Sequence, residues 1–264
     1  MTDKEKNDME DLRKSICMRE ISDILLDIEG TTCPVNFVTQ VLFPYAISHL
    51  SEFLESHGHT DTVKRLVAEI EQAWQQDKDE EACILRSQRS RSMVAYLQLL
   101  MRQDRKLPPL KELQGLIWHQ GYANGDLRVN LYDDVPATLD RWHRAGLKIA
   151  VYSSGSISAQ QLLYGHTDSG DLRPLFTGWF DTRIGSKIEA DSYRKIASSL
   201  QTKPNHILFI SDSQQEANAA REAGIKTVIC TRSEDARCQP LSNPSLQRSI
   251  DLASIHVTPI GISL

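Results

Sequence analysis

The sequence predicts an α/β protein whose parallel sheet carries a helical insert after its first strand. Three observations support this prediction. Short aliphatic runs alternate with helical patterns across residues 135–232, which is typical of βαβ units and a parallel sheet. A further aliphatic run at residues 24–26 stands apart from the others, near the start of the chain. The stretch between them, residues 34–125, has apolar residues at helix spacing and no pattern typical of a strand.

The first predicted strand runs from Ile21 through the aliphatic residues 24–26 and stops at Gly30. Two carboxylates, Asp27 and Glu29, lie at its carboxyl end with one residue between them. Alternate side chains of an extended strand share a face, so both carboxylates can point at one site. Ligands of open α/β sheets bind outside the carboxyl ends of the strands, which makes this acidic pair a candidate site. The alternative is a strand that ends in two solvated acids.

The insert is predicted to be helical throughout. Its apolar residues recur three and four positions apart, and Pro108-Pro109 interrupts the pattern before a last helix at residues 110–122. The mostly charged and polar N-terminal segment has no signal-peptide core and is predicted to be a frayed, solvated tail. The predicted domains are a tail at residues 1–20, a core at residues 21–33 and 126–264, and a helical cap at residues 34–125.

The remaining predicted strands and helices alternate along the core. Gly146 ends the first of these helices, because glycine readily takes the left-handed conformation that follows a helix. The predicted strands are residues 147–152, 206–210 and 226–230, with a short segment at 180–184, and the predicted helices are residues 135–145, 158–164, 192–200 and 214–223. Residues 233–264 contain no motif that we recognise.

Polar residues follow the strong strands at their carboxyl ends. Ser153 and Ser154 follow one strand, Asp212 follows another, and Lys187 precedes a helix. The carboxyl ends of parallel strands share one edge of the sheet, so these side chains are expected to meet Asp27. Taken singly, the serines and Asp212 have a simpler explanation as helix N-caps, and Lys187 as a solvated lysine. Their joint occurrence in this order favours a shared site.

The acidic residues fit phosphoryl transfer, which needs positioning and charge neutralisation. Asp27 is the candidate nucleophile and would form an aspartyl-phosphate. Glu29 is the candidate acid and base, and its backbone carbonyl is also available to a metal. Mg²⁺ prefers oxygen ligands, and Asp212 would supply it with a second carboxylate. Glu216, four residues further along the chain, is a candidate outer partner.

The serines and the lysine fit recognition of a phosphate group. Ser153 and Ser154 offer hydroxyls, and the turn at Gly155 offers backbone N–H groups at the start of a helix. Lys187 supplies a compact positive charge, whose bond to a phosphate oxygen is charge-assisted and therefore strong.

Composition argues against several other classes of function. The formal charge of −5 provides no basic field for nucleic acid, and no apolar run is long enough to span a bilayer. The five cysteines show no CxxC spacing, which argues against a disulfide framework or a zinc site and favours a reducing, intracellular setting. Cys33 lies near the acidic pair, where it is either a nucleophile or, the interpretation we favour, a small buried apolar residue.

Four segments in this order resemble the haloacid-dehalogenase-like hydrolase superfamily: LLDIEGTT, IAVYSSGS, IGSKIEADSY and LFISDSQQEA. Glu29 departs from the superfamily pattern, whose phosphatases usually have Asp at this position. DIEGTT with the following VNFVTQVLFPYA, and the long segments YSSGSISAQQLLYGHTDSGDL and FDTRIGSKIEADSYRKIA, are similar to the enolase-phosphatases of methionine salvage, also called acireductone synthases.

This resemblance implies a Rossmann-like, doubly wound parallel sheet core with a helical cap inserted after the first strand. It also implies one Mg²⁺ per subunit and a bifunctional reaction, in which 2,3-diketo-5-methylthiopentyl-1-phosphate is enolised and then dephosphorylated to 1,2-dihydroxy-3-keto-5-methylthiopentene. The expected partner is this small phosphorylated diketone, with no nucleic acid and no membrane, and the expected state is a cytoplasmic monomer; nuclear entry is left open. Two alternatives remain, another cap-bearing phosphatase of small metabolites and a catalytically silent binding protein on this fold.

Carried over residue by residue, the resemblance assigns three overlapping sets of residues. The base for the enolisation step is not among the assignments, because Glu29 and Lys187 are both candidates. The sets are Asp27, Glu29 and Asp212 for the metal; Ser153, Ser154 and Lys187 for the substrate; and Asp27, Glu29 and Lys187 for catalysis.

Overall fold

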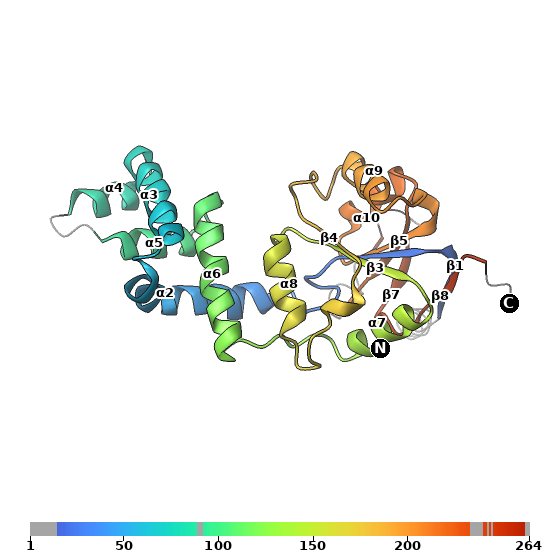
Figure 1. Ribbon diagram of the computed structural model, residues 1–264. Coiled ribbons are helices and arrows are strands. Elements are labelled where there is room, and N and C mark those ends of the chain that lie inside the picture. The colour runs from blue at the N-terminus through green and yellow to red at the C-terminus, as the bar shows by residue number, and fades with distance from the viewer. Residues whose placement is uncertain (1–14, 89–91, 233–239, 242, 244, 262–264) are drawn as a thin grey trace, which may run out of the picture. The chain divides into compact units, whose positions relative to one another are not determined.

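The computed structural model describes residues 15–88, 92–232, 240–241, 243 and 245–261, and the chain divides into two compact units (Figure 1). The first unit comprises Met1–Val35 together with Arg128–Leu264, and the second comprises Asn36–Leu127. The second unit is therefore an insertion that follows strand β2 (Asp23–Leu26) of the first. Among the described residues, no helix combines the length and the apolar character needed to cross a membrane.

A six-stranded parallel sheet forms the centre of the first unit. Its strands lie in the order β4-β3-β2-β5-β6-β7, with every neighbouring pair parallel. Leu25 of the central strand β2 lies opposite Ala150 on one side and Phe209 on the other. The order of the strands reverses at β2, which is where ligands of such sheets bind. The other strands are β3 (Lys148–Tyr152), β4 (Gly178–Phe180), β5 (Ile207–Ser211), β6 (Lys226–Cys230) and β7 (Gln247–Ser249).

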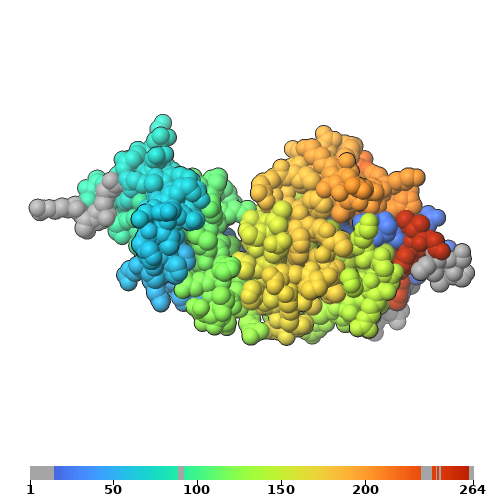
Figure 2. All heavy atoms as spheres, viewed as in Figure 1, coloured from blue at the N-terminus to red at the C-terminus, as the bar shows by residue number. Residues whose placement is uncertain are grey.

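Helices cover both faces of this sheet. Leu25, Tyr152 and Phe209 point to one face, where they form a buried cluster with residues of α9 and α10. Helix α7 lies on the opposite side of the sheet (Figure 1). In the space-filling view, helices and loops between residues 130 and 200 cover the visible face of this unit, and little of the sheet shows through (Figure 2). The helices are α7 (Asp134–Arg144), α8 (Ile157–Gly165), α9 (Ala190–Ser199) and α10 (Gln214–Glu222), with single 3-10 turns at Arg173–Leu175 and Pro204–His206.

The predicted α/β fold with a parallel sheet covered on both faces is confirmed. Its central strands are mostly apolar without alternation because both of their faces are buried. All four residues of β2 and all five of β5 are buried, as their near-continuous apolar sequences required.

A second, two-stranded sheet corrects the predicted N-terminal tail. Strand β1 (Ile16–Ile21) pairs in parallel with β8 (Ile255–Pro259), and Ile16 lies opposite Ile255. The prediction of a frayed tail at residues 1–20 is therefore wrong for residues 16–20, and residues 1–14 lie outside the described part. Only the first and last residues of β1 are buried, and its partner comes from the segment after residue 232 in which no motif was recognised. A strand with so few buried residues and so distant a partner has little local signal.

The second unit is helical over its described residues, 36–88 and 92–127, and includes no strand there. Side-chain caps begin three of its helices: Thr60 accepts the N–H of Val63, and Asp79 and Ser92 cap α4 and α5 in the same way. Gly125, with φ of 81°, ends the last helix. The elements are a π-helical turn at Val38–Leu42, α2 (Phe43–His57), α3 (Asp61–Gln76), α4 (Glu80–Ser87), α5 (Met93–Arg102) and α6 (Pro108–Asn124).

The predicted break before the last helix is present, since α5 ends at Arg102, but Pro108 and Pro109 do not form it. They form the first turn of α6, which therefore starts before the predicted helix at residues 110–122 and ends after it. Proline is tolerated in the first turn because the N–H that it lacks has no partner within a helix there. The last helix of the predicted insert is thus longer at both ends than expected.

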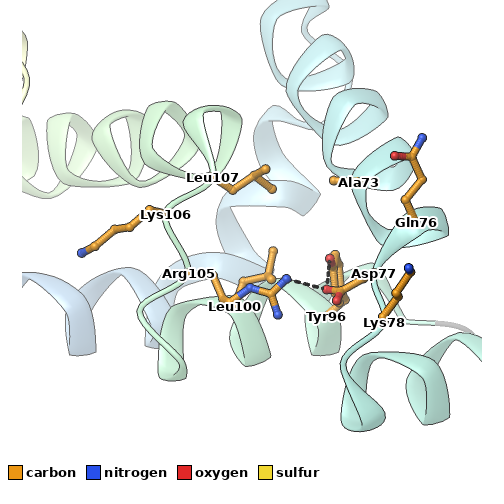
Figure 3. Close-up of a pocket in the computed structure, with 9 residues that line it drawn as sticks. All are labelled: Ala73, Gln76, Asp77, Lys78, Tyr96, Leu100, Arg105, Lys106 and Leu107. Carbon is orange, nitrogen blue, oxygen red and sulfur yellow. Dashed lines mark hydrogen bonds and ion pairs between the residues drawn. The ribbon is translucent and has the colours of Figure 1, made fainter. Parts of the chain in front are cut away.

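A hollow of about 340 Å³ in the second unit is lined by nine residues, among them the buried Asp77 (Figure 3). Burial disfavours the charged carboxylate, but donors from the Asp79 N–H, the Tyr96 hydroxyl and the Arg105 guanidinium more than offset this and lower the pKa of Asp77. The Tyr96 and Arg105 donors lie 2.8 and 3.0 Å from the carboxylate. The side chain of Lys106 extends away from this group rather than toward it. Asp77 therefore joins the α3–α4 link to α5 and to the α5–α6 link, a structural role.

Candidate active site

The carboxyl ends of β2, β3 and β5 and the loop after β4 converge on one edge of the parallel sheet. Asp27 follows β2 directly, and its N–H donates to the carbonyl of Ile210 at 3.0 Å, which extends the pairing of β2 with β5. Asp27 is 5% exposed. Its carboxylate is therefore held close to the sheet edge, with limited access to water.

Lys187 reaches this edge from the loop after β4 and bridges two carboxylates. Its Nζ lies 2.5 Å from Oδ1 of Asp27 and 2.7 Å from Oε2 of Glu216. The Lys187 side chain is 12% exposed, and burial alone would disfavour the ammonium. The carboxylates of Asp27 and Glu216 outweigh burial and raise the pKa of Lys187. The structure thus brings together Asp27 and Lys187, which are 160 positions apart in the sequence.

Thr31 orients the second oxygen of Asp27. Its hydroxyl donates to Oδ2 of Asp27 at 3.3 Å, and the residue is fully buried. Because Lys187 contacts Oδ1 and Thr31 contacts Oδ2, rotation of the Asp27 carboxylate is restricted. Sequence reasoning missed this role, although the Gly-Thr-Thr run directly after the acidic pair was a signal that could have indicated it.

Asp212 lies against the turn that follows β2. A Cβ built at Gly30, whose φ is +76°, would lie 2.2 Å from Oδ2 of Asp212, so only glycine lets this carboxylate approach the turn. Asp212 is at the surface but crowded by protein; this desolvation, together with the charges of Asp27 and Glu216, raises its pKa to about 7. Three carboxyl groups, those of Asp27, Glu216 and Asp212, thus surround the single ammonium of Lys187.

Asp212 is not the helix cap that its position alone suggested. The N-cap of α10 is Ser213, whose hydroxyl accepts the N–H of Glu216 at 3.4 Å. Glu216 itself is held in place by Ser211, which donates to its Oε2 at 2.9 Å. Burial, followed by the charge of Asp27, raises the pKa of Glu216.

The two serines after β3 are likewise not the cap of the next helix. The cap of α8 is Ser156, whose hydroxyl accepts the N–H of Ala159 at 3.3 Å. Ser153 is buried and accepts the N–H of Gly155 at 3.1 Å, whereas Ser154 is exposed. The simpler explanation of this serine pair as N-caps is thus replaced by a turn that places Ser154 at the surface of the sheet edge.

Gln160 stabilises this turn through a hydrogen bond to its backbone and was missed by sequence reasoning. Its buried Nε2 donates to the carbonyls of Gly155 and Phe180, each at 2.8 Å. It therefore joins the turn after β3 to the end of β4. A glutamine inside a helical pattern gives no sign of such backbone contacts, so no sequence signal could have found it.

Glu29 lies in the tight turn between Asp27 and Gly30 and is half-buried. Backbone bonds define this turn, among them the N–H of Gly30 to the carbonyl of Cys33 at 2.8 Å. Cys33 is fully buried, and this burial, followed by the charges of Glu29 and Asp27, raises the pKa of its thiol. A thiol that stays protonated is a poor nucleophile, which favours packing as the role of Cys33.

The donors at this edge suit one hard divalent cation. The described residues contain no group of three or more His, Cys, Asp or Glu side chains arranged to hold a metal by themselves. Mg²⁺ does not need such a group, because it usually binds one or two carboxylates and keeps several waters. The carboxylates of Asp27 and Asp212 suit this role, and the charges of Asp27 and Glu216 are close enough to Asp212 to contribute, after desolvation, to its raised pKa.

Comparison with known proteins gives a consistent result. The chain matches the haloacid dehalogenase-like hydrolase family over residues 24–224. It is 44% identical over 231 residues to the enolase-phosphatase E1 of Synechococcus sp. (strain CC9902), covering 85% of this chain and 94% of that protein. It is 44% identical over 243 residues to the enolase-phosphatase E1 of Drosophila melanogaster, covering 91% and 94%. The solved structure of the UTR4 protein of Saccharomyces cerevisiae has a TM-score of 0.71 at 29% identity, covering 88% of this chain and 98% of that one.

Proposed function

Because the chain belongs to the haloacid dehalogenase-like hydrolase family, and within it to the enolase-phosphatases, we propose that it acts in methionine salvage. The substrate is 2,3-diketo-5-methylthiopentyl-1-phosphate, and the products are 1,2-dihydroxy-3-keto-5-methylthiopentene and phosphate. The observation that carries the proposal is the Asp27 carboxylate held between Lys187 and Thr31 at the edge of the sheet.

Asp27 is the nucleophile of the phosphatase step. One oxygen of its carboxylate attacks phosphorus, the bond from phosphorus to the substrate oxygen breaks, and an aspartyl-phosphate forms. Glu29 donates a proton to the leaving oxygen and then accepts one from the water that releases phosphate. Lys187 and Thr31 support this role because they fix the orientation of the attacking carboxylate before substrate arrives.

Ser153, Ser154 and Lys187 bind the phosphate group of the substrate. Lys187 contributes a compact charge at the edge where the phosphate must sit, and the bond it makes is charge-assisted. Gln160 supports this function by holding the serine turn in place through Gly155.

One Mg²⁺ per chain would be held by Asp27 and Asp212, with Glu29 contributing through its backbone carbonyl. When bound, the ion supplies the positive charge that lets an anionic carboxylate approach an anionic phosphate. The grouping of the Asp27, Glu216 and Asp212 carboxyl groups around one ammonium supports this assignment.

Enolisation requires a base that removes a proton from carbon, for which Glu29 and Lys187 are the candidates. Lys187 is bound to two carboxylates, an arrangement that keeps it cationic and suits it to stabilise the enolate oxygen. We therefore assign the base to Glu29. The helical unit, residues 36–127, is proposed to act as a cap over the substrate, and the enzyme is proposed to be a cytoplasmic monomer that binds neither nucleic acid nor membrane.

Product analysis with the methylthio diketone phosphate tests this function. We expect Mg²⁺-dependent release of phosphate together with the absorbance of the enediol product. Release of phosphate from generic phosphate esters without enediol formation from the diketone would instead identify another small-metabolite phosphatase. No phosphate release from any ester would favour the third possibility, a silent binding protein.

A further inference from the structure

Arg232 is a buried cation that the proposed chemistry does not use. It lies two residues beyond the end of β6, and its side chain is 7% exposed. Its Nε and Nη2 both donate to the carbonyl oxygen of Thr31, at 3.0 and 2.7 Å. Its Nη1 lies 2.7 Å from Oδ1 of Asp134, and its guanidinium carbon lies 4.3 Å from the centre of the Tyr132 ring. The guanidinium is therefore fixed in both position and plane.

These contacts join the turn after β2 to two other parts of the first unit. Asp134 begins α7, and its second oxygen accepts the N–H of Leu252 at 2.6 Å. The N–H of Tyr132 donates to the carbonyl of Thr32 at 3.1 Å. The turn is thus held by Arg232 and by the chain that leads into α7, rather than by its own backbone bonds alone.

Thr31 connects Arg232 to the proposed nucleophile. Its carbonyl accepts both bonds from Arg232, and its hydroxyl donates to Oδ2 of Asp27 at 3.3 Å. Fixing the carbonyl of a residue restricts its backbone rotation and hence the position of its side chain. We propose that Arg232 is a positioning residue, which acts through Thr31 to hold the Asp27 carboxylate in line with Lys187.

The chemistry of arginine suits this role. A planar guanidinium can donate to one carbonyl with two groups and to a carboxylate with a third, whereas the single ammonium of lysine has no such fixed geometry. The charge of Arg232 is paired with Asp134, so we expect it to act through geometry rather than through an electric field at the reacting atoms. This inference rests on the proposed role of Asp27 as nucleophile.

Arg232→Met, compared with Arg141→Met, tests the inference. Arg141 is a matched control because it also joins α7 to the C-terminal segment, donating to the carbonyls of Ala253 and Ile255 at 3.2 and 3.3 Å. Within the described residues its side chain donates to the C-terminal segment and not to the turn after β2. We expect Arg232→Met to lower kcat by about tenfold or more, because small misplacements of reacting groups are costly, with a smaller change in KM. Arg141→Met should lower the thermal midpoint and leave kcat unchanged.

A double-mutant cycle with Thr31→Val separates positioning from a purely structural role. Thr31→Val removes the hydroxyl that contacts Asp27, so adding Arg232→Met should then lower kcat much less than it does in the original chain. If the two substitutions lower kcat independently, so that the fall in the double variant is the product of the two single falls, the proposed route through Thr31 is overturned. If Arg232→Met does not fold, Arg232→Lys decides the matter: we expect a several-fold fall in kcat at nearly constant KM, and full kcat would overturn the inference.

The outcomes also distinguish this inference from the proposed function. Retained turnover in Asp27→Asn would remove the nucleophile itself, and with it the basis for any positioning role. Loss of turnover in Asp27→Asn together with full kcat in Arg232→Met would refute only the role of Arg232.

Discussion

Gly30→Ala tests how closely Asp212 must approach the turn after β2. The added Cβ would lie 2.2 Å from Oδ2 of Asp212, whereas an ordinary van der Waals contact begins at 3.4 Å. Asp212 lies at the surface and can rotate away, so the carboxylate should move by about 1 Å, a displacement that can cost about 10²-fold in rate. We expect kcat/KM for phosphate release to fall by about this factor, and the Mg²⁺ concentration for half-maximal activity to rise.

Gly146→Ala is the control for backbone strain. Gly146 has φ of +81°, close to the +76° of Gly30, and no atom lies within 4 Å of a Cβ built there. Both variants should lose about 1–2 kcal/mol of unfolding free energy, the penalty of a left-handed conformation for a residue with a Cβ. Only Gly30→Ala should lose activity. Equal activity of the two variants in steady-state assays over a range of Mg²⁺ concentrations would refute the argument.

Three further predictions concern other parts of the chain. Lys187→Met removes the cation between Asp27 and Glu216, so we expect turnover to fall by about 10²-fold or more and KM to rise; near-normal steady-state kinetics would contradict this role. Gln160→Met keeps the size of the side chain but loses the 2.8 Å bonds to the carbonyls of Gly155 and Phe180. The KM for the substrate should therefore rise, and urea denaturation should show a loss of about 1–3 kcal/mol of unfolding free energy. An unchanged KM would argue against a link between Gln160 and phosphate binding. Folding lowers the pKa of Asp77, so its ionised carboxylate stabilises the fold at pH above the unfolded pKa of about 4. This stabilisation is lost as the pH falls through the folded pKa. The difference in unfolding free energy between the original chain and Asp77→Asn, measured by urea denaturation, should therefore become smaller below pH of about 4. A difference that does not depend on pH would contradict the stabilising role of the Asp77 carboxylate.

The sequence predicted the parts of the fold whose signal is local. Residues 24–26 and 207–210 are apolar and entirely buried, so the central strands were recognisable from their composition. Strand β1 was missed because only its first and last residues are buried and its partner lies near the other end of the chain. Pro108-Pro109 was misinterpreted because proline both breaks a helix and begins one, and only the position in the helix distinguishes the two.

In the candidate site, too, some residues could be predicted from the sequence and others could not. Side chains that follow strands, such as Asp27 and Asp212, could be placed at one edge because parallel strands end there together. Residues that act on backbone carbonyls could not be found in this way. Gln160 and Arg232 bind the carbonyls of Gly155 and Thr31, and a sequence contains no pattern for a partner that every residue offers.

Trapping the covalent intermediate tests the central claim most directly. Enzyme mixed with substrate and Mg²⁺ would be quenched in acid during turnover, reduced with borohydride and digested, and the modified peptide would be identified by mass spectrometry. We expect the modification on Asp27, and none in Asp27→Asn. A modification on any other residue, or turnover in the Asp27→Asn variant, would contradict the account.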